Sequence, residues 1–189
     1  MRLQLATGNK HKIDEVRSIL GDNSGIELVG YSGEEPVENG VSFYENALIK
    51  ARTAFVATGI PTIADDSGLA VEVMGGAPGI LSARWCGEKD DAKNRDLLLS
   101  QLIDMDHRQA SFVCSIAYVD EDGEHGFTGV WSGEIAREAR GEGGFGYDPI
   151  FIPDGFEITA AELPAEVKNS MSHRFLALTQ LAGFLRRPQ

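Results

Sequence analysis

Residues 62–73 read TIADDSGLAVEV, and this stretch is the strongest indication of the fold. Residues 62–64 have the composition of a buried strand and residues 69–73 that of the next strand, with the acidic turn DDSG between them. Open α/β sheets bind their ligands at the carboxyl ends of strands. We therefore predict a sheet with a ligand site at the end of the strand that precedes Asp65.

Strands and helices alternate on the N-terminal side of this stretch. We expect strands at residues 3–6 and 26–29, with a helix at residues 9–20 between them. A second helix begins at the capping box of Ser42 and Glu45, in which a hydroxyl and a carboxylate each satisfy a free backbone N–H group.

Strands adjoin one another on the C-terminal side. In residues 111–119 every second side chain, from Phe112 to Tyr118, is apolar and falls on one face, which is the period of a half-buried strand. This order of elements predicts one mixed α/β domain (α/β or α+β), residues 1–189, around a mixed sheet. The remaining expected elements are strands at 127–132 and 134–137, a helix from Asp90 or Asp91 to Leu102, a short helix after a capping box at 159–162, and a final helix at 175–185.

Composition and charge limit the classes of function. The chain has 189 residues, of which 42% are hydrophobic and 24% are charged, as in ordinary globular proteins. Its net charge of −12 disfavours a nucleic-acid polymer or an anionic membrane as partner, because neutralising phosphates requires a basic face. A small polyanion remains possible, since it requires only a local cluster of cations.

Cysteine usage and hydropathy favour the cytoplasm. The two cysteines, Cys86 and Cys114, cannot form a disulfide framework, and the sequence has no Cys-x-x-Cys pair for zinc. We find no signal peptide and no run of about 18 apolar residues, the length that a membrane span needs. We therefore expect a cytoplasmic protein without a membrane partner.

Residues 7–12, TGNKHK, are a candidate phosphate site. They form a strand-to-helix turn with a glycine, small polar side chains and two lysines, and a helix N-terminus favours anions. The segment does not match the Walker A loop, GxxxxGK[ST]. The alternative is an ordinary capped turn with solvated lysines.

Glu38, Asp65 and Asp66 are candidate ligands of a hard cation. Mg²⁺ is usually held by a few carboxylates together with phosphate oxygens of the substrate. Adjacent residues of a regular strand face opposite sides, so only one of Asp65 and Asp66 would point into a given site. The alternative is that these acids serve the turn alone, in a role like that of a helix cap.

Residues 141–148, GEGGFGYD, form a glycine-rich loop. They match the dinucleotide pattern GxGxxG, but that motif should follow the first strand and open a helix, so we reject dinucleotide binding. The glycines still let a ligand approach the backbone, and Phe145 and Tyr147 could stack on a base. The alternative is a loop tip whose aromatic residues belong to the core.

Ser172, His173 and Arg174 stand at the start of the final expected helix, four residues after Lys168. A cationic first turn opposes the helix dipole, which favours acids there, and such a broken rule often marks a functional site. The alternative is a structural histidine.

Taken together and in order, these segments resemble the nucleoside-triphosphate pyrophosphatases that hydrolyse inosine, deoxyinosine and xanthosine triphosphates, the ITPase family. Each motif is weakly specific alone, but six in the same order are not expected by chance. At Leu81 many members have an aromatic residue, which touches no expected catalytic group. The matching segments are TGN at 7–9 with Lys12, ENG at 38–40 with FxENA at 43–47, ADDSGL at 64–69, GAPGI at 76–80, GGFGYDP at 143–149 and SHR at 172–174.

The resemblance implies an ITPase-like mixed α/β fold, in which a long central mixed sheet with flanking helices forms two lobes around a cleft, usually in a homodimer. It implies Mg²⁺-dependent release of pyrophosphate from a small-molecule nucleoside triphosphate, which removes non-standard purine nucleotides from the pool. Glu38 and Asp66 would bind magnesium. Asp66 would also accept the proton of the attacking water, with Asp65 as the alternative base. The substrate-binding candidates are Thr7, Gly8, Asn9, Lys10, His11, Lys12, Lys50, Ser67, Phe145, Gly146, Tyr147, Asp148, Lys168, His173 and Arg174.

Two other functions remain open at this point. One is a related pyrophosphatase for other modified nucleotides, such as pyrimidines, although the SHR and FGYD segments argue against it. The other is a non-catalytic module that binds a nucleotide without releasing pyrophosphate.

Overall fold

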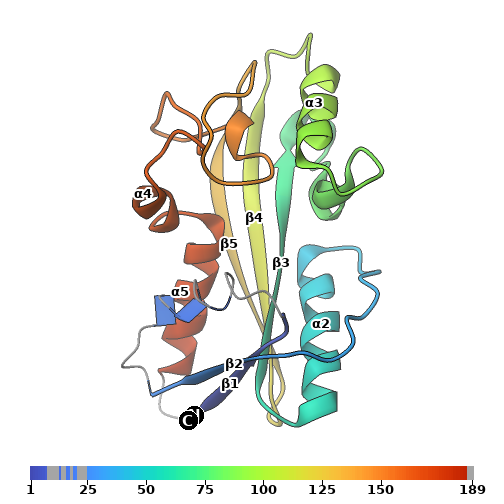
Figure 1. Ribbon diagram of the computed structural model, residues 1–189, viewed down its shortest axis with the longest axis vertical. Coiled ribbons are helices and arrows are strands. Elements are labelled where there is room, and N and C mark those ends of the chain that lie inside the picture. Colours follow the sequence, from blue (N-terminus) through green and yellow to red (C-terminus); the bar gives the residue numbers. More distant parts are fainter. Residues whose placement is uncertain (8–12, 14–15, 18, 21–24, 187–189) are drawn as a thin grey trace. The chain divides into compact units, whose positions relative to one another are not determined.

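The computed structural model of the protein describes residues 1–7, 13, 16–17, 19–20 and 25–186. In this part of the chain the strands form a six-stranded sheet with the order β2-β1-β3-β4-β5-β6 (Figure 1). β1 pairs in parallel with β2 and with β3, whereas β5 and β6 are antiparallel, so the predicted mixed sheet is confirmed. The strands are β1 Arg2–Leu5, β2 Glu27–Gly30, β3 Thr62–Val71, β4 Gln109–Val119, β5 Glu124–Ile135 and β6 Phe151–Pro153.

The chain divides into two compact units, each with its own buried hydrophobic residues. β3, β4 and β5 contribute residues to both units. The first unit comprises Met1–Asp66, Cys114–Gly129 and Arg174–Gln189, and the second comprises Ser67–Val113 and Val130–His173.

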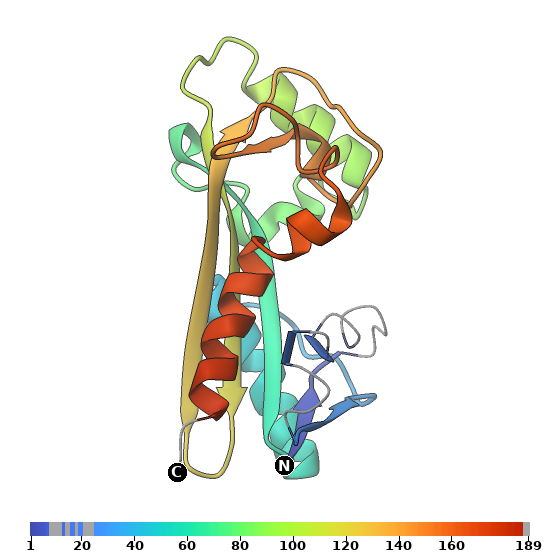
Figure 2. The same ribbon diagram turned by 90° about the vertical axis from the view of Figure 1, so that its left-hand side faces the viewer.

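Helices α2 (Phe43–Thr58) and α5 (His173–Leu185) cover opposite faces of the strands of the first unit (Figures 1 and 2). Because successive strand residues point to opposite faces, Ile63 packs in the cluster that contains residues of α5, and Ala64 packs in the cluster that contains residues of α2. β4 is covered in the same way, so residues 114–119 are all buried rather than half-buried as predicted.

The start of α2 follows the sequence prediction with one difference. Ser42 Oγ accepts a hydrogen bond from Glu45 N at 3.2 Å, as a capping residue should. Glu45 Oε2 accepts from Val41 N at 2.8 Å, so the return bond of the capping box reaches the residue before Ser42. The described residues 13, 16–17 and 19–20 are helical, as expected for this helix, whereas its expected first residue, Asn9, lies outside the described residues.

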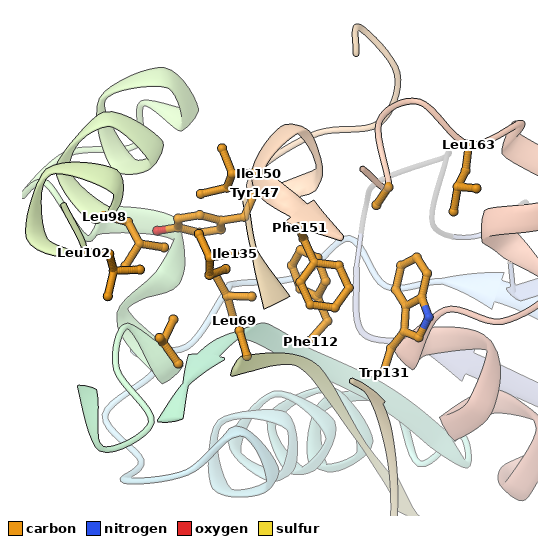
Figure 3. Packing of buried hydrophobic residues seen from close by; sticks show 13 residues of the cluster. Leu69, Leu98, Leu102, Phe112, Trp131, Ile135, Tyr147, Ile150, Phe151 and Leu163 are labelled. Carbon is orange, nitrogen blue, oxygen red and sulfur yellow. The ribbon is translucent and has the colours of Figure 1, made fainter. Parts of the chain in front are cut away.

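The second unit is built around three aromatic rings. Phe112, Trp131 and Phe151 have ring centroids 4.7 to 6.4 Å apart (Figure 3). Leu98 of helix α3 belongs to the same cluster. The helices of this unit are α3 Asp91–Gln101 and α4 Ala165–Asn169, with the 3₁₀ helices η1 Glu72–Met74, η2 Gly79–Arg84 and η3 Asp148–Ile150.

Arg108 is a buried cation of the second unit, with only 6% of its surface exposed. Its guanidinium donates hydrogen bonds of 2.6 to 2.8 Å to the carbonyl oxygens of Leu102, Ile135 and Ala136. Burial lowers the pKa of the guanidinium. These bonds link Leu102, which ends α3, to the end of β5. They also provide hydrogen-bond partners for a charged group whose burial would otherwise be costly.

β3 is one continuous strand, so the predicted turn at residues 65–68 is wrong. Gly68 serves close packing rather than chain reversal, because a Cβ atom there would lie 2.4 Å from Ser82 Oγ and 2.6 Å from Gly79 O. The two acids therefore lie inside a strand, and Asp65 and Asp66 point to opposite faces of it.

β5 is also a single strand, where the sequence predicted two. Gly133 suggested a break, but this glycine lies where β6 pairs with β5. A Cβ atom at Gly133 would lie 2.2 Å from Ile152 O. Sequence patterns do not distinguish a glycine that ends a strand from one that admits a neighbouring backbone.

The short helix expected directly after residues 159–162 does not form there. Glu162 Oε2 accepts a hydrogen bond from Thr159 N at 2.7 Å, which is one of the two bonds of a capping box. Residues 160–162 nevertheless form a turn and not the first turn of a helix. The next helix begins at Ala165, because Pro164 has extended geometry with ψ 136°.

No helix among the described residues is long and apolar enough to cross a membrane. Both cysteines are free thiols, and Cys114 is buried whereas Cys86 is partly exposed.

Candidate active site

A pocket of about 140 Å³ lies in the first unit, beside the carboxyl ends of β1 and β2. Because β1 is parallel to both of its neighbours, the residues that follow β1 and β2 meet at one edge, next to Asp65 of β3. Parallel strands bind ligands at such an edge. The pocket is lined by Ala6, Thr7, Tyr31, Glu34, Glu35, Pro36, Glu38, Lys50 and Asp65.

Lys50 of α2 joins two of the predicted metal ligands. Its Nζ atom lies 3.2 Å from Glu38 Oε1 and 3.9 Å from Asp66 Oδ1. The side chains of Lys50 and Asp66 are each 17% exposed, so water screens these charges only in part. Glu38 and Asp66 thus converge on one cationic position. Among the described residues, no three His, Cys, Asp or Glu side chains are grouped closely enough to hold a metal by themselves.

Asp65 and Asp66 have different partners because they point to different faces of β3. Asp65 Oδ2 lies 3.4 Å from both Nε and Nη2 of Arg174 in α5, and these two side chains are 11% and 9% exposed. Asp66 lies beside α2, where Asn46 Nδ2 donates to its Oδ2 atom at 3.1 Å. The two acids thus have partners from different helices, as the alternation of strand residues predicts.

A second group of predicted residues lies in the second unit, around Asp148. Asp148 Oδ2 accepts a hydrogen bond from Phe145 N at 2.8 Å and lies 2.5 Å from Lys168 Nζ. The same ammonium lies 5.2 Å from the centroid of the Phe145 ring, within the range of a cation–π interaction. Phe145 is 66% exposed although its backbone is held, so it presents an aromatic face to solvent.

The loop that carries Phe145 is anchored at the next two residues. Gly146 N donates to Asp91 Oδ2 at 2.9 Å, and Arg95 Nη1 donates to Gly146 O at 2.7 Å. The Tyr147 hydroxyl donates to Ser82 O at 2.8 Å, and burial raises the pKa of this phenol far above its usual value. Tyr147 lies among Leu98, Ile135 and Ile150 in Figure 3 and is 4% exposed, which matches the core alternative for this residue.

His173 is the first residue of α5 and is 8% exposed. Its ring stacks on that of Phe112, with centroids 5.0 Å apart and an angle of 13° between the planes. Ser172 directly precedes the helix and is buried. Ser67 lies in β3 and is partly exposed. The predicted phosphate residues Gly8, Asn9, Lys10, His11 and Lys12 lie outside the described residues, and Thr7 lines the pocket.

Sequence reasoning gave no role to three residues that contact this machinery. In the sequence, Asn46 stands out only as part of the FxENA motif, and Asp91 and Arg95 only as part of an expected helix. A buried asparagine in the first turns of a helix is itself a signal, because its polar atoms require partners. Asp91 and Arg95 carry no such signal, since charged residues near a helix start are ordinary.

Comparison with known proteins gives consistent matches. The model of the Ham1 family matches residues 3–184. A protein of Leifsonia xyli subsp. xyli named dITP/XTP pyrophosphatase is 53% identical over 191 residues, which cover 98% of this chain and 96% of that protein. A protein of the same name from Mycobacterium tuberculosis (strain ATCC 25618 / H37Rv) is 48% identical over 194 residues, with 98% and 95% covered.

Solved structures agree in fold along the whole chain. The Staphylococcus aureus Ham1 protein has a TM-score of 0.92 at 39% sequence identity, with 98% of each chain covered. A HAM1 protein from Coxiella burnetii has a TM-score of 0.92 at 42% identity, again with 98% of each chain covered. These matches confirm both the mixed α/β fold and the resemblance found in the motifs. The chain belongs to the Ham1 family.

Proposed function

We propose that this protein is a nucleoside-triphosphate pyrophosphatase that hydrolyses ITP, dITP and XTP to the monophosphate and pyrophosphate. The observation that carries the proposal is the convergence of Glu38, Asp66 and Lys50 beside the pocket, in a chain 53% identical to a dITP/XTP pyrophosphatase. Phosphoryl transfer needs charge neutralisation and a positioned water rather than covalent chemistry by the protein, and these residues are suited to both tasks.

The carboxylates fit magnesium. Glu38 and Asp66 supply hard oxygen ligands near the position of one ammonium group, and Mg²⁺ typically takes one or two carboxylates and completes its shell with phosphate oxygens and water. When bound there, the ion supplies positive charge to the phosphate oxygens and makes a water molecule more acidic.

Asp66 is the proposed proton acceptor. A water oxygen bonds to the α-phosphorus, the bond from that phosphorus to the bridging oxygen of pyrophosphate breaks, and the proton of the water passes to Asp66. Asp65 is less suited to this role, because its Oδ2 atom faces the guanidinium of Arg174.

The triphosphate is proposed to contact Lys50 and the segment from Thr7 to Lys12, with Ser67 as a further contact. Lys50 is anchored by one carboxylate in the loop before α2, that of Glu38, and by one in strand β3, that of Asp66, so its ammonium is held in place for a phosphate oxygen. Together with a bound divalent cation, these lysines would supply the local positive charge that a polyanion needs on a chain of net charge −12.

The base is proposed to contact residues 145–148 together with Lys168, His173 and Arg174. Phe145 offers an exposed ring for stacking. Asp148 holds the backbone N–H of Phe145, and the ammonium of Lys168 lies over its ring. Arg174 has hydrogen-bond donors and no acceptor, so it is suited to the oxygen at C6 of hypoxanthine and xanthine. We further propose that the enzyme acts as a cytoplasmic homodimer in nucleotide-pool sanitation, and the free thiols suit a reducing compartment.

A nucleotide panel tests the proposal. The protein is mixed with Mg²⁺ and, separately, with ITP, dITP, XTP, ATP, GTP and a modified pyrimidine triphosphate, and pyrophosphate and nucleoside monophosphate are measured. We expect both products from the first three in preference to the others. Faster hydrolysis of the pyrimidine identifies the related pyrophosphatase instead. Binding of ITP without any product identifies a nucleotide-binding module.

A further inference from the structure

Asn46 occupies an unusual position in α2. It is 3% exposed, and the buried residues that follow it along the helix are Ala47, Leu48, Ala51 and Ala54. Asparagine is a poor residue for a helix interior, and a buried amide is costly unless both of its ends are hydrogen-bonded. Its presence among small apolar residues therefore requires partners, and the structure supplies two.

The partners of Asn46 determine the orientation of its amide. Its Oδ1 atom accepts a hydrogen bond from Gly40 N at 2.9 Å, and its Nδ2 atom donates to Asp66 Oδ2 at 3.1 Å. A backbone N–H can only donate and an ionised carboxylate can only accept, so the reversed amide would lose both bonds. The side chain thus bridges the loop before α2 and strand β3.

The loop end of this bridge carries a proposed cation ligand. Gly40 follows Glu38 by two residues, and a Cβ atom at Gly40 would lie 2.8 Å from Asn46 Oδ1 and 2.7 Å from Glu45 Cβ. Glycine is therefore needed for the loop to approach the helix this closely. Glu45 fastens the same loop through its bond to Val41 N.

The strand end of the bridge controls Asp66. Asn46 and Lys50 are one helical turn apart on α2, so both reach toward β3. Asn46 bonds to Oδ2 of Asp66, whereas Lys50 lies 3.9 Å from Oδ1. With one carboxylate oxygen bonded to Asn46, the rotation of the Asp66 carboxylate is restricted and its other oxygen is directed to the position that Lys50 and Glu38 share.

We propose that Asn46 is a positioning residue that holds Asp66 and the Glu38 loop at a fixed separation, so that the two carboxylates are ready for a divalent cation before substrate binds. This inference rests on the proposed function for its catalytic consequence. Asn46 does not touch the reacting atoms, and its effect passes through Asp66 and Glu38.

Asn94 provides a matched control. It occupies the same place in α3 as Asn46 does in α2, four residues after the capping residue, and is 1% exposed. Its Oδ1 atom also accepts from a loop N–H, that of Cys86, at 2.8 Å. Its Nδ2 atom donates to the carbonyl of Ala83 at 3.2 Å instead of to a carboxylate. The two asparagines therefore share burial and loop anchoring but differ in the group at the amide nitrogen.

The experiment compares Asn46→Ala with Asn94→Ala in the full chain. Four quantities are measured: the Mn²⁺ affinity of the nucleotide-free protein by electron paramagnetic resonance, kcat for dITP, KM for dITP, and the Tm. We expect Asn46→Ala to lose about 10- to 100-fold in Mn²⁺ affinity and in kcat, the range typical of residues that orient metal ligands. Asn94→Ala should lower the Tm without changing Mn²⁺ affinity or kcat by more than about twofold.

The outcomes separate the inference from the proposed function. Wild-type affinity for Mn²⁺ in Asn46→Ala, equal losses in both variants, or wild-type protein that binds no Mn²⁺ would each overturn the positioning role. If no variant hydrolyses dITP but Asn46→Ala alone loses Mn²⁺ affinity, the positioning role stands and the proposed function fails. Should Asn46→Ala not fold, Gly40→Ala tests the same bridge from the loop side, and unchanged Mn²⁺ affinity in that variant overturns the inference.

Discussion

The ammonium nitrogen of Lys50 lies 3.2 Å from Oε1 of Glu38, so a lysine of α2 neutralises the loop carboxylate beside the pocket. With a nucleotide bound, the same ammonium is proposed to face phosphate. Lys50→Met should therefore reduce kcat/KM for dITP by about 100-fold or more, since a charge-assisted contact to the reacting group is lost. Lys93→Met is the control, because Lys93 pairs with Glu88 at the surface. Equal activity of both variants would exclude a role for Lys50.

Replacing the two adjacent acids should have different effects. Asp66→Asn should lose about 10²- to 10⁴-fold in kcat while nucleotide binding persists, the usual effect of removing a positioned base. Asp65→Asn should retain most of kcat, because Asp65 contacts Arg174 rather than the proposed cation position. Single-turnover rates with dITP measure both. Near-native turnover in Asp66→Asn together with a large loss in Asp65→Asn would show that Asp65, and not Asp66, accepts the proton.

Arg174 should determine the choice of base. Hypoxanthine and guanine have an acceptor oxygen at C6, whereas adenine has a donor amino group, and a buried unpaired polar group costs about 1–3 kcal/mol. Arg174→Ala should therefore lower the preference for ITP over ATP, measured as the ratio of the two kcat/KM values, much more than it lowers the preference for ITP over GTP. Arg137→Ala, at an exposed pair with Asp106, should change neither ratio. If both ratios fall equally in Arg174→Ala, the residue is a general anchor.

Removal of divalent cations should abolish turnover. Dialysis against a chelator is expected to stop pyrophosphate release, and Mg²⁺ should restore it. Glu38→Gln should raise the Mg²⁺ concentration for half-maximal activity by about tenfold or more, because a charged ligand is lost. Glu34→Gln removes the same charge from the same pocket and should have a much smaller effect. Undiminished activity in chelator would contradict the proposed metal role.

Arg108 should matter for stability rather than for chemistry. Arg108→Met retains an apolar stem but leaves the carbonyl oxygens of Leu102, Ile135 and Ala136 without this donor. Leu102 O still accepts from Met105 N, so two of the carbonyls lose a donor that is not duplicated there. Each buried unsatisfied group costs about 1–3 kcal/mol, so the free energy of unfolding should fall by about 2 kcal/mol or more. Urea unfolding followed by circular dichroism measures this loss. A decrease below about 1 kcal/mol would show that water or neighbouring groups replace the guanidinium.

Local signals predicted most of the elements because they report short-range physics. The cap bond of Ser42 and the apolar spacing of α2 depend on contacts within one helix, and both are present. The predictions at Gly68 and Gly133 were wrong because each glycine admits a backbone or side chain from a distant segment. Such close approaches are tertiary, and no sequence window contains both partners.

The candidate site was predictable in residue types but not in pairing. The alternation rule correctly separates Asp65 from Asp66 once β3 is continuous, yet their partners Arg174 and Asn46 are 109 and 20 residues away in the chain. Tyr147 was considered for base stacking and is instead bonded to Ser82 O in the core. The motifs therefore indicate which residues belong to the site region. Only the fold distinguishes the residues that face solvent from those that are buried beneath them.

Isotope incorporation tests whether water attacks the α-phosphorus and pyrophosphate leaves. The protein is incubated with dITP and Mg²⁺ in water enriched in ¹⁸O, and the products are analysed by mass spectrometry. We expect one ¹⁸O atom in the deoxyinosine monophosphate and none in the pyrophosphate. Label in the pyrophosphate, or release of inorganic phosphate with the nucleoside diphosphate, would contradict it.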